Sequence, residues 1–133
     1  MKDRFKFRFF DVENKKMYDV KNICFVGEPT VTVDYKPVIK KQIYKGYLIQ
    51  CTGLKDKNGK LIYEGDIIKI EYYDYGIKYR IGVVEWEDDG FCVTYHNAKD
   101  TKVSGCSLVD IVNGDKQEVI GNIFQDKELM NEA

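Results

Sequence analysis

The chain has 133 residues, of which 44% are hydrophobic and 14% aromatic, and its formal net charge is −1. This length is typical of about one domain of roughly 100–200 residues, and the apolar share is ample for one packed core, so the composition excludes a disordered chain. No run of about 18 apolar residues occurs, and the N-terminal segment MKDRFKFRFF is not followed by the apolar stretch of a signal peptide. We therefore expect a soluble protein of the cytoplasm.

The first third of the chain predicts a β-hairpin followed by a loop. In RFKFRFF the aromatic residues alternate with basic ones, which is the period-two pattern of a half-buried strand. Turn residues in DVENKK then precede a short second strand near residues 17–20. A glycine and two prolines interrupt residues 21–40, so we expect mostly loop there, with one β segment near residues 30–34.

The middle of the chain predicts strands joined by tight turns. QIYKGYLIQC, residues 42–51, is rich in tyrosine, isoleucine and leucine and reads as a strand. Asn58-Gly59 is a strong hairpin signal, because a type I′ turn needs positive φ at both central positions. Gly65-Asp66 then predicts a sharp entry into a strand on which Ile68 and Ile70 share one face.

Two further strands are predicted in YRIGVVEWEDDGFCVTYH, with a turn at Asp88-Asp89-Gly90. Apolar residues occur on both faces of the first of these strands, so we expect a β-bulge near Gly82 and a buried Trp86. EVIGNIF supplies a last strand, and Asp126 is expected to cap a short helix in KELMNEA.

Together these elements predict a single, mainly β domain over residues 1–133. Residues 1–51 form an N-terminal β region that contains the hairpin. Short, twisted strands bent at glycines and arranged as a meander favour an SH3-like small barrel over residues 52–124. Residues 125–133 form the short C-terminal helix.

The cysteines do not indicate a metal or catalytic site. Cys24, Cys51, Cys92 and Cys106 are widely spaced, and His96 is the single histidine. Structural zinc sites show close-spaced ligand pairs, and a catalytic cysteine needs a base beside it, which nothing in the sequence supplies. We interpret the four cysteines as reduced thiols, most of them buried.

The carboxylates offer one more possible chemistry, a two-metal site for phosphodiester cleavage. The candidates are Glu64, Asp66, Glu85, Glu87, Asp88 and Asp89. Several of them fall in predicted turns, which favours a solvated surface. We therefore predict a protein without enzymatic activity, metal or cofactor.

The stretch YYDYGIKYR, residues 72–80, is the best candidate for a contact surface. Tyrosine and arginine are favoured at binding hot spots, and tyrosine rings also stack on single-stranded bases. The predicted partner-binding residues are Tyr73, Tyr75, Lys78 and Arg80. The alternative is that Tyr72 and Tyr79 belong to the barrel core and that Tyr75-Gly76 is only a hairpin tip.

Charge is divided along the chain. Residues 1–50 carry 11 Lys and Arg against 6 Asp and Glu, and residues 51–133 carry 10 against 16. Complementary charges steer protein association. We therefore predict a homo-oligomer whose interface includes residues 1–20, with Phe5, Phe7 and Phe9 as its apolar core and the charges as its rim.

Four segments carry a family resemblance. FRFFDVENKKMY, QCTGLKDKNGKLIYEGDIIKI, GVVEWEDDGF and EVIGNIFQDKEL follow one another over most of the chain, and together they resemble the YopX family of small proteins encoded mainly by bacteriophages and prophages. Cys51 stands where a larger residue is expected, and Gln125-Asp126-Lys127 replaces Glu-Asn-Pro. The resemblance implies a β-rich fold and a phage or prophage origin, hence the cytoplasm of a bacterial host. It implies no catalytic residues, because the family has none assigned.

Two functions remain open. The first is a phage accessory protein that acts as a non-enzymatic interaction module by docking onto another protein. The alternative is a nucleic-acid-binding protein of phage DNA metabolism, since small barrels often serve that end. A pI near 5.9 and the acidic second part argue against general phosphate binding, so we expect weak binding to random duplex DNA.

Overall fold

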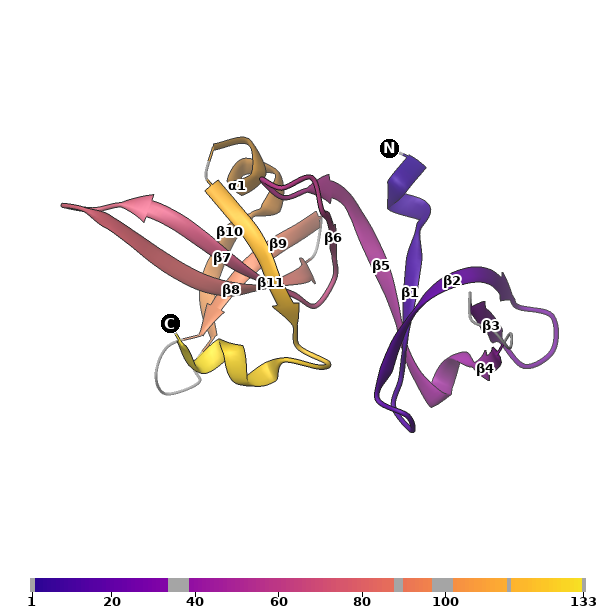
Figure 1. Ribbon diagram of the computed structural model, residues 1–133. Helices are drawn as coiled ribbons and strands as arrows, with labels where there is room; N and C mark the ends of the chain where they lie inside the picture. Colours follow the sequence, from indigo (N-terminus) through magenta and orange to yellow (C-terminus); the bar gives the residue numbers. More distant parts are fainter. Residues whose placement is uncertain (1, 34–38, 88–89, 97–101, 115, 133) are drawn as a thin grey trace. The chain divides into compact units, whose positions relative to one another are not determined.

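The computed structural model describes residues 2–33, 39–87, 90–96, 102–114 and 116–132 (Figure 1). The chain divides into two compact units, residues 1–51 and residues 52–133. Antiparallel strands make up most of both units, which confirms a mainly β fold. Within the described ranges, no helix combines the length and the hydropathy needed to cross a membrane.

The strands form two sheets. The first unit contains η1 (Lys2–Phe5), β1 (Phe7–Asp11), β2 (Lys16–Cys24), β3 (Thr30–Val33), β4 (Ile39–Gln42) and η2 (Ile43–Lys45), and β5 (Gly46–Lys55) continues into the second unit. The second unit adds β6 (Leu61–Tyr63), β7 (Asp66–Tyr73), β8 (Ile77–Glu87), β9 (Gly90–His96), β10 (Lys102–Ser107), α1 (Leu108–Gly114), β11 (Lys116–Asn122) and η3 (Lys127–Glu132). The strand orders are β4-β3-β2-β1-β5-β6 and β10-β9-β8-β7-β11.

The predicted N-terminal hairpin is present as β1 and β2, which pair from Arg8 opposite Asp19 to Asp11 opposite Lys16. The buried Asp11 carboxylate accepts hydrogen bonds from the Glu13 backbone N–H (3.0 Å) and the Asn14 Nδ2 (2.9 Å). Burial tends to raise the pKa of Asp11, but the bonds from Asn14 and the nearby Lys41 ammonium outweigh it and hold this pKa below its ordinary value. The carboxylate therefore fixes the turn.

The core of the first unit forms around Phe9, which is 0% exposed. Tyr18, Val31 and Val33 complete the buried cluster. The sequence prediction for residues 21–40 needs correction, because β2 extends to Cys24 and β4 begins at Ile39. Strands β2 and β3 pair with a register shift between Val20 and Asn22. The shift makes the sequence pattern irregular, and for this reason the pattern did not predict the strand pairing.

A buried aspartate organises the start of the second unit. The Asp56 Oδ1 accepts hydrogen bonds from the backbone N–H groups of Asn58 and Lys60, both at 2.9 Å. Its Oδ2 accepts from the Val119 N–H of β11, also at 2.9 Å. Gly59 has φ +80°, but Asn58 does not have positive φ, so a turn is present where Asn-Gly predicts one but it is not of type I′. One carboxylate therefore closes the β5–β6 turn and ties it to the last strand.

The core of the second unit lies against the second sheet. Its buried members are Ile62, Ile68, Ile70, Val84, Val93, Leu108 and Ile111. Leu108 and Ile111 belong to α1, a helix that the sequence analysis did not predict. Figure 1 shows α1 at one end of this unit, between β10 and β11 in the chain.

Strand β8 differs from the prediction in two respects. Its register with β7 and β9 runs without a shift through Gly82, so the expected bulge is absent there. Residues 81–84 are all buried, because both faces of the strand are covered at this point. A Cβ at Gly82 would lie 2.5 Å from Val93 Cγ1, so the glycine serves close packing. Trp86 is 56% exposed and not buried as expected, since it lies near the strand end and packs edge-on against Phe91.

The second sheet is open as far as the described strands show. β10 and β11 are its two edges, and none of the described pairings joins them to close an SH3-like barrel. The C-terminal segment is a short 3₁₀ helix, η3, preceded by Asp126, whose carboxylate accepts from the Asn122 N–H at 3.2 Å. A Cβ at Gly121 would lie 2.7 Å from that carboxylate, which explains the glycine there.

Candidate functional site

Strands β7 and β8 extend beyond their neighbours as a two-stranded ribbon. They pair from Ile67 opposite Val83 to Tyr73 opposite Ile77. β11 pairs with β7 only as far as Glu71, and β9 pairs with β8 only from Gly82 onward. Residues 72–81, which we name the projecting ribbon, thus lack further strand partners among the described residues. Figure 1 shows this ribbon reaching out from the rest of its unit.

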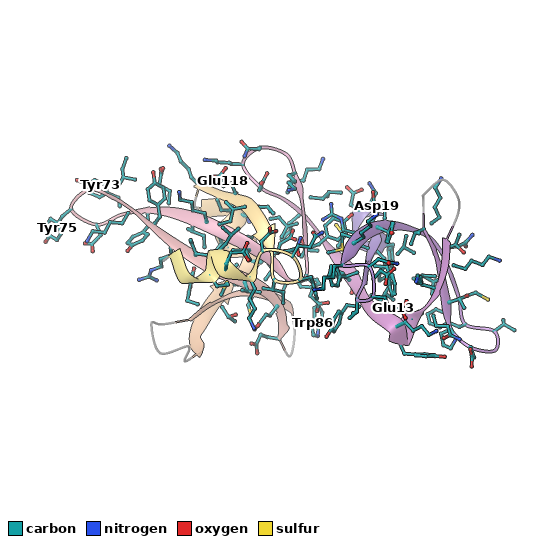
Figure 2. The ribbon with its side chains drawn as sticks, turned by 60° about the horizontal axis from the view of Figure 1, so that its bottom comes forward. Glu13, Asp19, Tyr73, Tyr75, Trp86 and Glu118 are labelled. Carbon is teal, nitrogen blue, oxygen red and sulfur yellow. The ribbon has the colours of Figure 1, made fainter. Side chains whose placement is uncertain are left out.

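One face of the projecting ribbon is apolar and exposed. Tyr73 is 81% exposed and lies opposite Ile77, which is 65% exposed. Tyr79 is 52% exposed and lies on the same face, two residues further along β8. Figure 2 shows Tyr73 and Tyr75 at the far end of the ribbon, directed away from the sheet. The interpretation of Tyr79 as barrel core is therefore wrong.

The tip of the projecting ribbon places Tyr75 in an unusual conformation. Its φ is +53°, in the left-handed region that bulky residues rarely adopt, and its side chain is 100% exposed. The adjacent Gly76 also has positive φ, and its carbonyl accepts from the Asp74 N–H at 2.8 Å. Tyr75 therefore adds backbone strain and gains no packing in return.

Tyr75→Asn should leave the free energy of unfolding unchanged or raise it by up to about 1 kcal/mol, because asparagine tolerates the left-handed region better. Urea denaturation followed by circular dichroism measures this. As a control, Tyr63→Asn removes a tyrosine that is 5% exposed and should cost about 3 kcal/mol. A loss above about 1 kcal/mol for Tyr75→Asn would mean that this tyrosine serves folding.

The opposite face of the ribbon holds an arginine between two tyrosines. The Arg80 guanidinium carbon lies 5.0 Å from the ring centroid of Tyr72 and 5.5 Å from that of Tyr95. In the part of the chain that the structure describes, no ion pair involves Arg80. The guanidinium therefore lies near both rings, and the residue is exposed to solvent. This geometry prepares the guanidinium for a planar anion such as a carboxylate.

The predicted partner-binding residues thus belong to one ribbon but to different parts of it. Tyr73 and Tyr75 lie at the tip, whereas Lys78 and Arg80 lie on the face opposite Ile77. The Lys78 ammonium lies 3.4 Å from the Asp74 carboxylate. This pair is exposed, so it contributes little to stability.

The three N-terminal phenylalanines do not form one exposed face. Phe9 is fully buried, Phe7 is half-buried and Phe5 is 70% exposed in η1. Phe9 therefore packs inside its own unit and is not free to contact another subunit. The predicted homo-oligomer would have to use Phe5 and Phe7.

The remaining candidate residues do not assemble a catalytic site among the described residues. No three His, Cys, Asp or Glu side chains there are grouped to hold a metal ion. The Asp66 carboxylate accepts from the Tyr63 N–H at 2.8 Å and so serves its turn, whereas Asp88 and Asp89 lie outside the described residues. Cys24 is exposed, Cys51 is buried and Cys92 is half-buried, and all three are reduced thiols. The side chains of His96 and Cys106 also lie outside the described set.

The family model described as YopX protein matches residues 6–131. The chain belongs to the YopX family. This confirms the resemblance seen in its sequence segments. Among curated proteins, no match is found.

Two solved structures show the same YopX fold. The crystal structure of protein EF1440 from Enterococcus faecalis has a TM-score of 0.61 at 23% identity, covering 94% of this chain and 96% of that one. The crystal structure of protein yopX from Bacillus subtilis has a TM-score of 0.60 at 23% identity, covering 95% and 98%. At this identity the likeness establishes the fold, and the site rests on the geometry of this chain.

A second carboxylate of this YopX protein, after Asp11, has a perturbed pKa. Burial, and then the negative charge of Glu85, raise the pKa of Glu64 above its ordinary value. The folded state therefore favours the protonated form. Its ionised form opposes folding at neutral pH, and this penalty declines as the pH falls through the raised pKa and disappears below the unfolded value of about 4.3.

Glu64→Gln should therefore raise the unfolding temperature at pH 7 but not at pH 3.5 or so, below the unfolded pKa. Thermal unfolding across this pH range measures the difference. Glu85→Gln removes the second cause alone and should weaken the pH dependence without abolishing it. A Glu64→Gln protein that is less stable than the parent at pH 7 would contradict this account.

The sequence analysis named the tip tyrosines but missed Ile77 and Tyr79 as exposed apolar residues. Their alternation with Lys78 and Arg80 is the pattern of an ordinary half-buried strand. The sequence held one signal for a projecting two-stranded ribbon. Only five residues separate the turn Asp74-Tyr75-Gly76 from Gly82, so the segment between them is a short stretch that needs no third strand beside it.

Proposed function

We propose that this protein is a phage- or prophage-encoded accessory protein that acts as a non-enzymatic interaction module and docks onto another protein through the projecting ribbon. One observation carries the proposal. Tyr75, which is fully exposed, occupies a strained backbone position between exposed Tyr73 and Ile77. Strained residues of this kind cluster at functional sites, and tyrosines are frequent binding hot spots.

The shape of the ribbon suits insertion into a partner. The strands below it are held by neighbours on both sides, so the tip stands on a rigid base. Tyr73 and Ile77 pair across the two strands, which fixes their positions relative to each other. Tyrosine side chains provide a large contact area at a low entropy cost, because they have only two rotatable bonds.

Nucleic-acid binding is less well supported. Arg80 and Lys69 lie over the rings of Tyr72, Tyr95 and Tyr79, so cations already occupy faces that a base would need for stacking. The acidic excess of residues 51–133 also opposes attraction of phosphates. A protein partner fits both observations better.

We also infer an SH3-like type for the second unit, as a finer description of its fold. β7 to β10 are consecutive neighbours, and β11 returns to pair with β7 after α1. The register shift between Val119 and Gly121 adds curvature. These features support a curved sheet that approaches a small barrel.

Site-specific photocrosslinking in bacterial cells that express the full chain tests the docking proposal. A benzophenone amino acid at position 75 should give a discrete protein adduct. The same group at Lys57, an exposed residue in the β5–β6 turn, should give none. Replacing Tyr73 and Ile77 by serine should abolish the adduct from position 75.

Two outcomes would overturn the proposal. Equal adducts from positions 75 and 57 would show that the ribbon has no special role. Adducts that nuclease treatment removes would show that the partner is a nucleic acid.

A further inference from the structure

The outer edge of β8 within the projecting ribbon lacks a strand partner among the described residues. Residues 77–81 pair with β7 on one side, and none of the described residues pairs with their other side. Such an edge presents backbone N–H and C=O groups in the spacing that an added strand needs. Extended peptides bind many proteins by adding to an edge of this kind.

The side chains of this edge alternate in character. Ile77 and Tyr79 are exposed on one face of the ribbon, and Lys78 and Arg80 lie on the other. An added strand also places successive side chains on opposite faces, next to those of the edge strand. The complementary strand therefore carries apolar residues on one face and acidic residues on the other.

Arg80 sets the preference for acidic residues. Its guanidinium carbon lies 5.0 Å from the ring centroid of Tyr72 and 5.5 Å from that of Tyr95, and these cation–π interactions reduce the entropy lost when it binds. Among the described residues it has no ion-pair partner. A carboxylate on the added strand would form a charge-assisted pair with the guanidinium of this exposed residue.

The same alternation argues against a second copy of this chain as the added strand. In an antiparallel pairing of two β8 edges centred on Tyr79, Lys78 of each copy lies opposite Arg80 of the other. Like charges directly opposite each other on one face destabilise a strand pair. The charges along this edge therefore disfavour pairing with the same edge of a second copy.

We propose that residues 77–81 bind an extended segment of a partner protein in which apolar and acidic residues alternate, with Arg80 as the main specificity residue. The proposal rests on the docking function above and specifies the chemistry of the partner. Ile77 and Tyr79 cover the apolar side chains, and the β8 backbone supplies the hydrogen bonds.

The test uses the full chain and a capped nine-residue peptide in which glutamate and valine alternate. Amide hydrogen exchange followed by NMR should show slower exchange of amides within residues 77–81 when the peptide is added. A peptide of the same composition with its glutamates in one block should give no protection. A peptide with lysine in place of glutamate should also give none.

Arg80→Gln should weaken binding of the alternating peptide about tenfold or more. Arg80→Lys should recover only part of the loss, because lysine lacks the paired N–H donors of the guanidinium. Lys57→Gln, which also removes one positive charge but from the exposed β5–β6 turn, should have no effect. Unchanged exchange of core amides such as that of Ile68 verifies that each variant is folded.

Several results would overturn the inference. The block or lysine peptide could bind as tightly as the alternating peptide, or the Arg80→Gln variant could bind it as tightly as the parent does. Protection of residues 77–81 could grow with protein concentration alone. A ten-nucleotide oligothymidine could protect the same amides and bind more tightly than the alternating peptide. If these occur while the adduct from position 75 persists, docking uses the tip and not the edge. If the adduct is lost while the peptide still protects the edge, the docking proposal fails and this one stands.

Discussion

Asp56→Ala is expected to lower the free energy of unfolding of the second unit by about 3 kcal/mol or more. The variant leaves the backbone N–H groups of Asn58, Lys60 and Val119 without their acceptor. An unsatisfied donor costs about 1–3 kcal/mol when buried, and water reaching the exposed Asn58 and Lys60 relieves part of the total. Urea denaturation followed by the fluorescence of Trp86, the single tryptophan, measures the loss in this unit.

Asp74→Ala is the matched control. Asp74 also lies in a tight turn of this unit, but its carboxylate pairs only with the exposed Lys78 among the described residues. Its removal should cost less than about 0.5 kcal/mol. If Asp56→Ala costs no more than this control, the Asp56 carboxylate does not tie the turn to β11. Faster exchange of the Val119 amide in Asp56→Ala would locate the broken link directly.

Gly65→Ala should destabilise the second unit by about 2–5 kcal/mol, for two reasons that add. Gly65 has φ +85°, where a Cβ costs about 1–2 kcal/mol. The new Cβ would also lie 2.6 Å from Phe124 Cε2. The backbone cannot move away easily, because the Gly65 N–H donates to Val84 (2.8 Å) and its carbonyl accepts from Ile123 (2.9 Å).

Gly59→Ala separates the two costs. Gly59 has a similar φ of +80°, but a Cβ added there would have no atom within 4 Å apart from those of its chain neighbours. Gly59→Ala should therefore lower the free energy of unfolding only by the conformational cost, about 1–2 kcal/mol. The difference between the two variants in urea denaturation gives the packing cost at Gly65. Equal losses would show that Phe124 moves aside without penalty.

The parts of the fold that sequence predicted well are those that local chemistry decides. The position of the Asn58-Gly59 turn follows from the turn preference of two residues, although the type differs from the predicted I′, and the first hairpin follows from alternation plus turn residues. The sharp turn at Gly65 is likewise encoded locally. In each case the local sequence sets the position of the turn, although distant residues, such as Val119 at Asp56 and Val84 at Gly65, help to hold it.

The predictions failed where distant residues decide. Both faces of β8 are covered at residues 81–84, so the apolar residues on both sides of Gly82 needed no bulge. Trp86 is exposed because the sheet ends near it, which a hydrophobicity pattern does not reveal. The helix α1 was missed because it is short. The sequence did contain a signal for it, since Leu108 and Ile111 have helical spacing and Ser107, a residue type favoured at helix N-caps, directly precedes them.

The candidate site was half visible in the sequence. Tyr73, Tyr75, Lys78 and Arg80 were named from residue type alone, and the structure places Tyr73 and Tyr75 at an exposed tip. That Arg80 lies between Tyr72 and Tyr95 depends on the register of three strands, so no local pattern encodes it. The exposure of Ile77 likewise depends on where β9 and β11 stop.

The pairing of β11 with β7 sets the order in which this unit is completed during synthesis. β7, with its buried Ile68 and Ile70, leaves the ribosome well before residues 116–122, which cover its edge. Until then β7 has a partner only in β8, and its other edge is an open template for pairing with another nascent chain. A chain that stalls or is cut before residue 116 should therefore aggregate, although it retains the whole projecting ribbon.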